Sequence, residues 1–252
     1  SGGNSLSDTI IQFFQNANIP ILEGYGLTET LAPCSVNPIH NQIIGSVGIP
    51  IGDVQIQINK QSEILIKTKS IFTEYYKDIN FTNKSLQDEW LHTGDLGYIN
   101  NQGHLIIIDR LDNMIKLNNQ SIISPQSIEN KITISRYISH CMVIGNNQNF
   151  LTCVIGIEKI NFLQLMAKMK IDRTTDIKIM SKHPDIKELI KNEIINVNKT
   201  LIESNKINSL FIAPEEFTIN KGYLTPSLKL RRQEIYNKYI KENTPINKVV
   251  TI

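Results

Sequence analysis

The pattern of apolar and polar residues predicts mostly strands before Arg110 and a mixture of helices and strands after it. A helical pattern at Ser7–Asn16 comes first, with Ser7 in a position to cap the helix. The strand predictions that follow are Val54–Ile58, where isoleucine and glutamine alternate, Ile64–Lys67 and Leu105–Ile108.

Beyond Arg110 the predicted elements are a helix at Pro125–Ile134, strands near Cys141–Ile144 and Leu151–Ile157, a long helix from Pro184 to about Asn205, and a helical stretch at Arg232–Lys241. The long helix has one apolar stripe, formed by Ile186, Leu189, Ile190, Ile194, Val197 and Leu201. Such a stripe is typical of a helix that packs on a core, and docking of a partner helix is the alternative. The polar segment Asp172–Lys182 has no clear periodicity and is interpreted as a surface insertion.

The composition limits the classes of protein to which this chain can belong. With 252 residues, of which 40% are hydrophobic, the chain can bury a sizeable core and suits one or two domains. The net charge of +2 gives no reason to expect nucleic acid as a partner. No apolar run approaches the ~18 residues of a membrane-spanning helix. The cysteines lack a CxxC spacing and the histidines lack a metal-ligand spacing, so we expect free thiols in a reducing, intracellular setting and no zinc site.

The most informative stretch is Trp90–Lys116, in which Thr93-Gly94-Asp95 precedes a turn, an apolar run and then Arg110. Because Gly94 permits a tight turn, we expect Asp95 at a loop tip, where its two oxygens can accept hydrogen bonds from the hydroxyls of a ribose. Arg110, at the end of a buried strand, offers a planar donor fork for sugar or phosphate oxygens. For either residue alone, a solvated surface ion pair is the alternative.

A second cluster lies at Gly24–Thr30, directly after a short apolar run. Tyr25 offers a flat face for a base, and Gly26 lets the backbone approach a ligand closely. Thr28 offers a hydroxyl for phosphate, and Glu29 offers a hard oxygen ligand for Mg²⁺. The alternative is a glycine-rich turn into a helix that Thr28 or Glu29 merely caps.

A third element lies at Gly222–Arg232. Pro226 and the small residues around it predict a loop, and Lys229 is the first cation after that proline. A lysine presented from a loop can bring a compact charge to a site where negative charge develops. A basic helix start on a solvated surface is the alternative.

Together these motifs resemble those of the adenylate-forming acyl-CoA synthetases, most closely the long-chain fatty acid group. The resemblance is carried by Tyr25–Thr30, Gly45–Pro50, Glu63-Ile64, Tyr75–Asp78, Trp90–Asp95, Asp109-Arg110, Ser124-Pro125, Ile128-Glu129 and Leu224–Arg232. It runs over nearly the whole chain and implies an α+β fold. Residues 1–109 would be the β-rich last part of a large AMP-binding domain, and residues 110–252 a small mobile α+β domain with a hinge near 110–113.

The resemblance implies an enzyme, a fatty acid–CoA ligase that works in two steps. A fatty acid attacks ATP to give an acyl-adenylate and pyrophosphate, and coenzyme A then displaces AMP. By the same resemblance Tyr25 stacks on adenine, Gly26 contacts the nucleotide, and Thr28 contacts its α-phosphate. Asp95 and Arg110 hold the ribose. Glu29 holds Mg²⁺, and Lys229 acts with Thr28 and Glu29 in catalysis.

Further roles follow from the resemblance at the domain boundary. Asp112 is the expected pivot of a domain rotation, and Lys116 and Gln120 lie on the face used in the thioester step. An i,i+4 pair of Asp112 and Lys116 on a helical turn is the alternative. The chain departs from its relatives at Ser62 and Gln120, where they usually carry glycine, and at Asn113, where they often carry aspartate.

A phosphate loop upstream of Tyr25, which the resemblance implies, is missing from this sequence. We therefore expect the chain to be the C-terminal part of a longer protein and to be inactive by itself. Peripheral association with an internal membrane through the missing part stays open beside a cytoplasmic location. Two alternatives remain: another adenylating enzyme, such as a fatty acyl-AMP ligase or a peptide-synthetase adenylation module, and a non-catalytic nucleotide-binding protein if the chain is complete.

Overall fold

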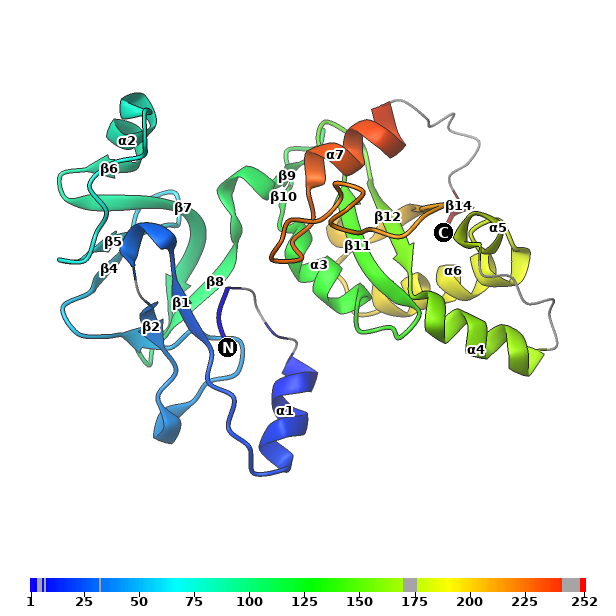
Figure 1. The fold of residues 1–252 in the computed structure, drawn as a ribbon, viewed down its shortest axis with the longest axis horizontal. Coiled ribbons are helices and arrows are strands. Elements are labelled where there is room, and N and C mark those ends of the chain that lie inside the picture. The colour runs from blue at the N-terminus through cyan, green and yellow to red at the C-terminus, as the bar shows by residue number, and fades with distance from the viewer. Residues whose placement is uncertain (4–5, 7, 32, 170–175, 242–249) are drawn as a thin grey trace. The chain divides into compact units, whose positions relative to one another are not determined.

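The structure, a computed structural model, describes all residues except 4–5, 7, 32, 170–175 and 242–249 (Figure 1). The chain forms two compact units, the first unit at Ser1–Asn113 and the second unit at Met114–Ile252. None of the helices among the described residues combines the length and the apolar character that a bilayer crossing requires.

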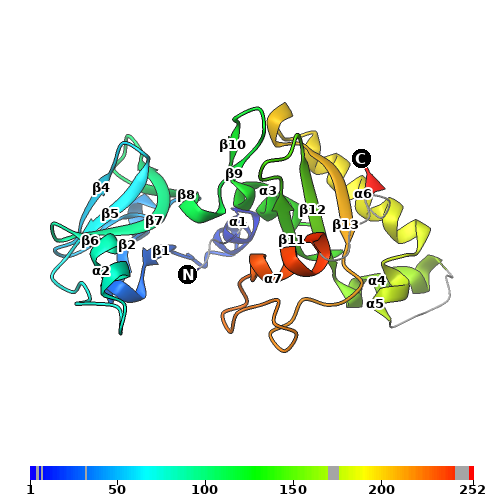
Figure 2. The ribbon, with the colours of Figure 1, turned by 90° about the horizontal axis from the view of Figure 1, so that it is seen from above.

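The first unit is mainly antiparallel sheet. The larger sheet has the strand order β4-β5-β7-β6, with β8 paired to β7, and Figure 2 shows β4, β5 and β7 side by side. Its strands are β4 (Gln55–Ile58), β5 (Glu63–Lys67), β6 (Leu86–Gln87), β7 (Trp90–Ile99) and β8 (Leu105–Arg110). The smaller sheet holds β1 (Gly24–Gly26), β2 (Pro33–Val36) and β3 (Ile49–Pro50). The helical elements are α1 (Asp8–Asn16), α2 (Ile79–Ser85) and the 3₁₀ turns η1 (Thr28–Thr30), η2 (Ile39–Asn41) and η3 (Leu111–Asn113).

One hydrophobic core joins the two sheets of the first unit. Ile64 and Ile66 of β5 are fully buried, because alternate residues of a strand face the same side. The same core contains Leu91 of β7, Leu105 of β8, Tyr25 of β1 and Cys34 of β2. The core therefore fixes β1 relative to β7 and β8.

The second unit contains a four-stranded sheet, in the order β11-β12-β13-β14, with helices on both faces. β12 and β13 are parallel, and the other neighbours are antiparallel. The strands are β9 (Ile115–Lys116) and β10 (Ile122–Ile123), which form a separate hairpin, then β11 (Ile138–Ile144), β12 (Leu151–Ile157), β13 (Ile207–Ile212) and β14 (Val250–Thr251). The helical elements are α3 (Pro125–Ile132), α4 (Lys159–Met169), α5 (Ile177–Met180), α6 (Pro184–Asn198), the 3₁₀ turn η4 (Glu203–Asn205), and α7 (Arg232–Tyr236), which continues as the π-helix η5 (Asn237–Lys241).

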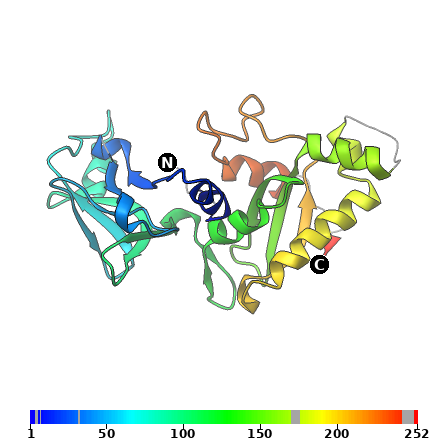
Figure 3. The same cartoon turned by 90° about the horizontal axis from the view of Figure 1, so that it is seen from below.

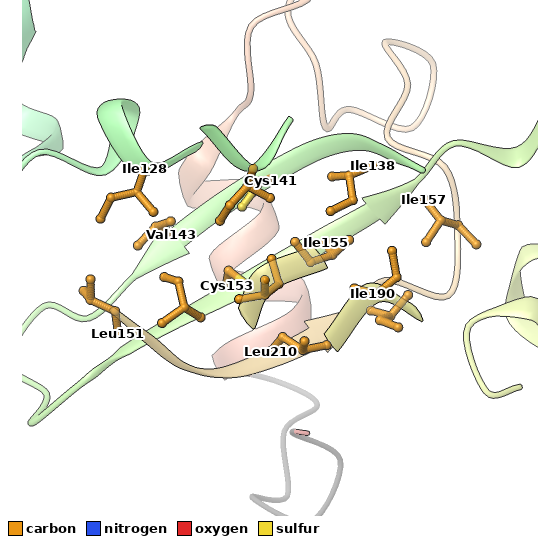
Figure 4. Close-up of a cluster of buried hydrophobic side chains, with 14 of the residues drawn as sticks. Ile128, Ile138, Cys141, Val143, Leu151, Cys153, Ile155, Ile157, Ile190 and Leu210 are labelled. Atoms are coloured by element: carbon orange, nitrogen blue, oxygen red, sulfur yellow. The ribbon is translucent and has the colours of Figure 1, made fainter. Parts of the chain in front are cut away.

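Alternate residues of this sheet face two different cores. Cys141 and Val143 of β11 face the larger core, which α3, α4 and α6 cover, whereas Met142 between them faces a smaller core with α7. Figure 3 shows the yellow helix α6 and the orange-red helix α7 on opposite faces of the sheet. Figure 4 shows Cys153 and Ile155 of β12 beside the β11 side chains in the larger core.

The α+β fold class is confirmed, and the apolar stripe of α6 packs on the larger core as predicted. The helix is shorter than predicted, because it ends at Asn198 rather than Asn205. The Asn198 side chain donates to the backbone oxygen of Ile207 at 2.8 Å and accepts from its N–H at 2.9 Å. This pair of hydrogen bonds joins the helix end to the start of β13.

Other predictions need correction. α3 ends at Ile132 rather than Ile134, since the Thr133 hydroxyl donates to the backbone oxygen of Glu129 at 2.9 Å and closes the last turn. Part of the predicted surface insertion, residues 172–175, lies outside the described residues, as does the predicted cap Ser7. The rest of that insertion forms α5, whose Ile177 and Met180 are buried in the larger core, so the surface prediction is wrong there.

Candidate functional site

Asp95 lies at the centre of the site in the first unit. It is a residue of β7, paired in register with Arg110 of β8, and not the loop tip that its glycine neighbour predicted. Its Oδ1 lies 3.2 Å from Nε of Arg110, and its Oδ2 accepts a hydrogen bond from the Tyr25 hydroxyl at 2.5 Å. The Asp95 side chain is 7% exposed and that of Arg110 is 49% exposed, so the ion pair joins a buried carboxylate to a half-exposed guanidinium.

The backbone around Asp95 is held by groups beneath it. Gly94 has a left-handed φ of +69°, and its N–H donates to Oε1 of Glu63 at 3.1 Å. The Thr93 hydroxyl donates to the backbone oxygen of Ile64 at 2.7 Å and accepts from the Asp95 N–H at 3.0 Å. Nδ1 of His92 lies 3.0 Å from Oε2 of Glu63. Glu63 thus anchors two residues that precede Asp95, and no local pattern indicated this role.

Tyr25 is more buried than a simple stacking platform. It is 8% exposed, and burial, reinforced by the charge of Asp95, raises the pKa of its hydroxyl far above the ordinary value. The hydroxyl therefore stays protonated as the donor to Asp95. The residue also lines an open hollow of about 650 Å³ together with Gly24, Gly26, Leu27, Thr28 and Leu31.

Thr28 and Glu29 begin the 3₁₀ turn η1, and neither of them caps it. The Thr30 hydroxyl makes the capping hydrogen bond instead, since it accepts from the Leu27 N–H at 3.1 Å. Thr28 is exposed, so its hydroxyl is accessible to a ligand. The capping alternative for Thr28 and Glu29 is therefore wrong.

Glu29 accepts a hydrogen bond from the Tyr75 hydroxyl at 2.8 Å on Oε1, and its backbone oxygen accepts from Phe72 N–H at 2.7 Å. Burial, followed by the hydrogen bond and charge of Glu29, raises the pKa of Tyr75 to about 12. Among the described residues, no three His, Cys, Asp or Glu side chains gather around one metal position. Mg²⁺ does not require such a cluster, because it is usually bound by one or two carboxylates together with phosphate and water oxygens.

Lys229 lies in the second unit, between β13 and α7. It is exposed, and it closes a tight turn in which the Thr225 N–H donates to the Lys229 backbone oxygen at 2.8 Å. The Lys229 N–H donates back to the Thr225 hydroxyl at 3.1 Å, and Leu228 has a left-handed φ of +62°. The loop predicted for this segment is confirmed.

Lys116 and Gln120 lie at the two sides of a second turn, and both are exposed. Lys116 ends β9, and Gln120 has a left-handed φ of +68°, the conformation that glycine favours. Asp112 belongs to η3, which ends at Asn113, so no continuous helical turn carries Asp112 and Lys116 as an i,i+4 pair. Arg110, predicted to start the mobile domain, belongs to the first unit because it pairs with Asp95 in the ladder.

Part of the chain matches a family model, and most of it matches curated relatives. Residues 1–76 match the family model described as AMP-binding enzyme. Long-chain-fatty-acid–CoA ligase 5 of Mus musculus is 32% identical over 251 residues, which are 93% of this chain and 36% of that relative. The chain is therefore similar to AMP-binding enzymes. Long-chain-fatty-acid–CoA ligase FadD15 of Mycobacterium tuberculosis is 26% identical over 95% of this chain and 40% of its own length, and fatty acyl-CoA synthetase B of Dictyostelium discoideum is 29% identical over 88% and 35%. The chain thus spans 35% to 40% of the length of these relatives.

Solved structures share the fold of this chain. The adenylation domain of the carboxylate reductase from Mycobacterium chelonae matches with a TM-score of 0.76 at 22% identity, over 96% of this chain and 37% of that one. O-succinylbenzoate coenzyme A synthetase from Bacillus subtilis, in complex with AMP, matches with a TM-score of 0.71 at 19% identity, over 93% and 44%. The predicted resemblance to acyl-CoA synthetases is confirmed.

Proposed function

We propose that this chain is part of a fatty acid–CoA ligase that activates its substrate with ATP. In the first step a carboxylate oxygen of the fatty acid attacks the α-phosphorus of ATP, the bond from that phosphorus to the bridging oxygen breaks, and pyrophosphate leaves. In the second step the thiol of coenzyme A loses its proton and attacks the acyl carbonyl carbon, and AMP leaves. The observation that carries the proposal is the buried Asp95 carboxylate between Tyr25 and Arg110, and the names of the curated relatives support it.

The two oxygens of Asp95 have different surroundings, and this difference suggests how a ribose binds. Oδ2 is held from the core side by Tyr25, whereas Oδ1 pairs with the half-exposed Arg110. A ribose hydroxyl therefore reaches the carboxylate on the Arg110 side, where the guanidinium can turn to a sugar or phosphate oxygen. Tyr25 keeps its hydrogen bond, and the base enters the hollow that its ring lines.

The charges of the first step have candidate partners in both units. Mg²⁺ at Glu29 would neutralise phosphate charge when bound, and the Thr28 hydroxyl would donate to the α-phosphate. Lys229 would place its ammonium where negative charge develops on the attacking and leaving groups. Rotation at Asp112 would then exchange Lys229 for the face that carries Lys116 and Gln120.

The test uses the full-length protein, because this chain spans only 35% to 40% of the length of its curated relatives. Fatty-acid-dependent exchange between ATP and pyrophosphate measures the first step, and AMP release that depends on coenzyme A measures both. Lys229→Ala should lower exchange by about 10²- to 10³-fold, the loss typical of one electrostatic donor. Thioester formation from supplied acyl-AMP should be unchanged.

The matched control is Lys206→Ala, which removes a surface lysine that pairs only locally with Glu203. Normal folding of the wild-type protein without any fatty-acid-dependent exchange would overturn the proposal. Equal loss of both steps in Lys229→Ala would remove the role of that lysine.

A ligase that forms the adenylate and passes the acyl group to another acceptor is the second candidate. Gln120 favours it, because the family resemblance implies glycine there and this chain carries an exposed side chain on the proposed thioester face. Adenylate that accumulates in the presence of coenzyme A, with thioester formation restored by Gln120→Gly, would support this candidate over the first.

A further inference from the structure

Lys229 lies on a loop that has no regular secondary structure from the end of β13 to the start of α7. A lysine on a free loop samples many positions, and holding one of them costs conformational entropy. Catalytic groups have to be positioned within a fraction of an ångström, since a displacement of about 1 Å can lower a rate by about 10²-fold. The loop therefore has to be anchored if Lys229 acts in adenylation.

The anchor on the C-terminal side of the Lys229 turn is an ion pair between α7 and α3. Nη1 of Arg232 donates to Oε1 of Glu129 at 2.9 Å, and Nη2 donates to Oε2 at 2.5 Å. Glu129 is 7% exposed, and its Oε1 also accepts from the Val143 N–H at 2.7 Å. A bidentate pair at a buried carboxylate fixes the direction as well as the distance of the guanidinium.

Glu129 is itself held rigidly. Its neighbours Ile128 and Ile132 on α3 are buried in the larger core, and Val143 belongs to β11. Arg232 is the first residue of α7, directly after Arg231, whose N–H donates to the backbone oxygen of Tyr223 at 2.8 Å. The start of α7, and with it the C-terminal end of the turn, is thus held against the sheet and α3.

The anchor on the other side of the turn is a second glutamate. Oε1 of Glu215 accepts hydrogen bonds from the hydroxyls of Tyr223 at 2.9 Å and Tyr239 at 2.8 Å. Its Oε2 lies 3.1 Å from the ammonium of Lys221, and both tyrosine rings are buried in the smaller core. Tyr223 precedes the turn directly, so the turn is held from both ends.

We propose that Glu129, acting through Arg232, is a positioning residue for Lys229 in the adenylation step, with Glu215 fixing the other end of the same turn. This inference rests on the proposed function of Lys229. A plain stabilising ion pair would serve the whole second unit equally. A positioning pair instead affects the turn at residues 224–230, and only the half-reaction that uses Lys229.

The experiment compares Arg232→Lys and Glu129→Gln with the control Glu203→Gln, which alters an exposed ion pair in the same unit. Arg232→Lys keeps the positive charge but loses the bidentate hydrogen bonds of the guanidinium. It therefore tests the same contact if Glu129→Gln does not fold. In the full-length protein, kcat for ATP–pyrophosphate exchange should fall about 10- to 100-fold in the two anchor variants. The KM for ATP and thioester formation from supplied acyl-AMP should stay within about twofold.

Hydrogen exchange gives a readout that does not depend on catalysis. The backbone N–H groups of residues 224–230, apart from Pro226, should exchange faster in Arg232→Lys, while those of β12 keep their wild-type rates, because only the turn loses its anchor. Glu203→Gln should change neither rate.

The outcomes separate this inference from the proposed function. Unchanged adenylation and unchanged exchange at 224–230 in Arg232→Lys, with adenylation lost in Lys229→Ala, overturns the positioning role and leaves the proposed function intact. Equal loss of adenylation and thioester formation in Arg232→Lys also overturns it. Unchanged adenylation in Lys229→Ala overturns the proposed role of that lysine, and faster exchange at 224–230 would then support the anchor alone.

Discussion

Replacing Tyr25 by phenylalanine removes one hydroxyl from the core of the first unit and leaves the ring in place. In the wild type this hydroxyl donates to Oδ2 of Asp95, a carboxylate whose side chain is 7% exposed. A hydrogen bond to a charged group contributes about 1.5–3 kcal/mol to stability, and no cavity opens because the rings have nearly the same volume. The expected loss in the free energy of unfolding is therefore about 2 kcal/mol.

The assay follows from the position of the single tryptophan. Trp90 lies in β7 with Asp95, so its fluorescence reports unfolding of the first unit alone. With an m-value of about 2 kcal/mol per M, a loss of about 2 kcal/mol lowers the urea midpoint by about 1 M. The unfolding equilibrium constant rises about thirtyfold.

Tyr98→Phe is the matched control. Tyr98 lies in the same strand and is 50% exposed, so its hydroxyl is available to water and its loss should move the midpoint little. A Tyr25→Phe midpoint equal to that of Tyr98→Phe would refute the claim that Tyr25 holds the Asp95 carboxylate.

Three further predictions concern other parts of the chain. Gly48 has a φ of +82°, and a Cβ there would lie 2.0 Å from the backbone of Val36. Gly48→Ala should therefore lower the free energy of unfolding, followed by Trp90 fluorescence, by about 3 kcal/mol or more. Gly52→Ala, at φ +59° in open space, should lower it by only about 1 kcal/mol. The phenolate absorbance titration of the wild type should contain a group near pH 12 that Tyr75→Phe lacks. Because folding raises the pKa of the Tyr75 hydroxyl, the stability that this residue contributes is present below the ordinary pKa of 10.0 and is lost as the pH rises through about 12. At Glu215, burial raises the pKa of the carboxyl, but the hydroxyls of Tyr239 and Tyr223 and the Lys221 ammonium outweigh burial and lower the pKa below 4.5. The stability of the wild type over Glu215→Gln, measured by unfolding followed by circular dichroism, should therefore be present above pH 4.5 and be lost as the pH falls below it.

The site residues of the first unit could be predicted from short motifs, but their mutual contacts could not. Gly94 marks a special backbone position, and Arg110 ends an apolar strand, so both are visible locally. The hydrogen bond from Tyr25 to Asp95 joins residues 70 positions apart, and that from Tyr75 to Glu29 joins residues 46 apart. Such contacts are set by the packing of sheets, which a local pattern does not contain.

The same reason explains why Asp95 was expected on a loop. Glycine between Thr93 and Asp95 is a turn signal, and Gly94 does have a left-handed φ. The strand nevertheless continues through it, because Glu63 and Thr93 supply the hydrogen bonds that hold this irregular stretch. Gly94 thus has the left-handed backbone that the motif predicts, and the pairing of β7 with β8 keeps Asp95 within a strand.

Two positions at which the family resemblance implies glycine, Ser62 and Gln120, have the backbone conformation that glycine favours. Ser62 has a φ of +65° and Gln120 has a φ of +68°, a conformation that costs a residue with a side chain about 1–2 kcal/mol. Hydrogen bonds hold both turns: Ser62 N–H donates to Asn59 at 3.0 Å, and Gln120 N–H donates to Leu117 at 3.0 Å. The path of the chain is therefore preserved at both places. Any effect of Gln120 on coenzyme A must then come from the volume and polarity of its exposed side chain, because the turn that carries it has the glycine shape.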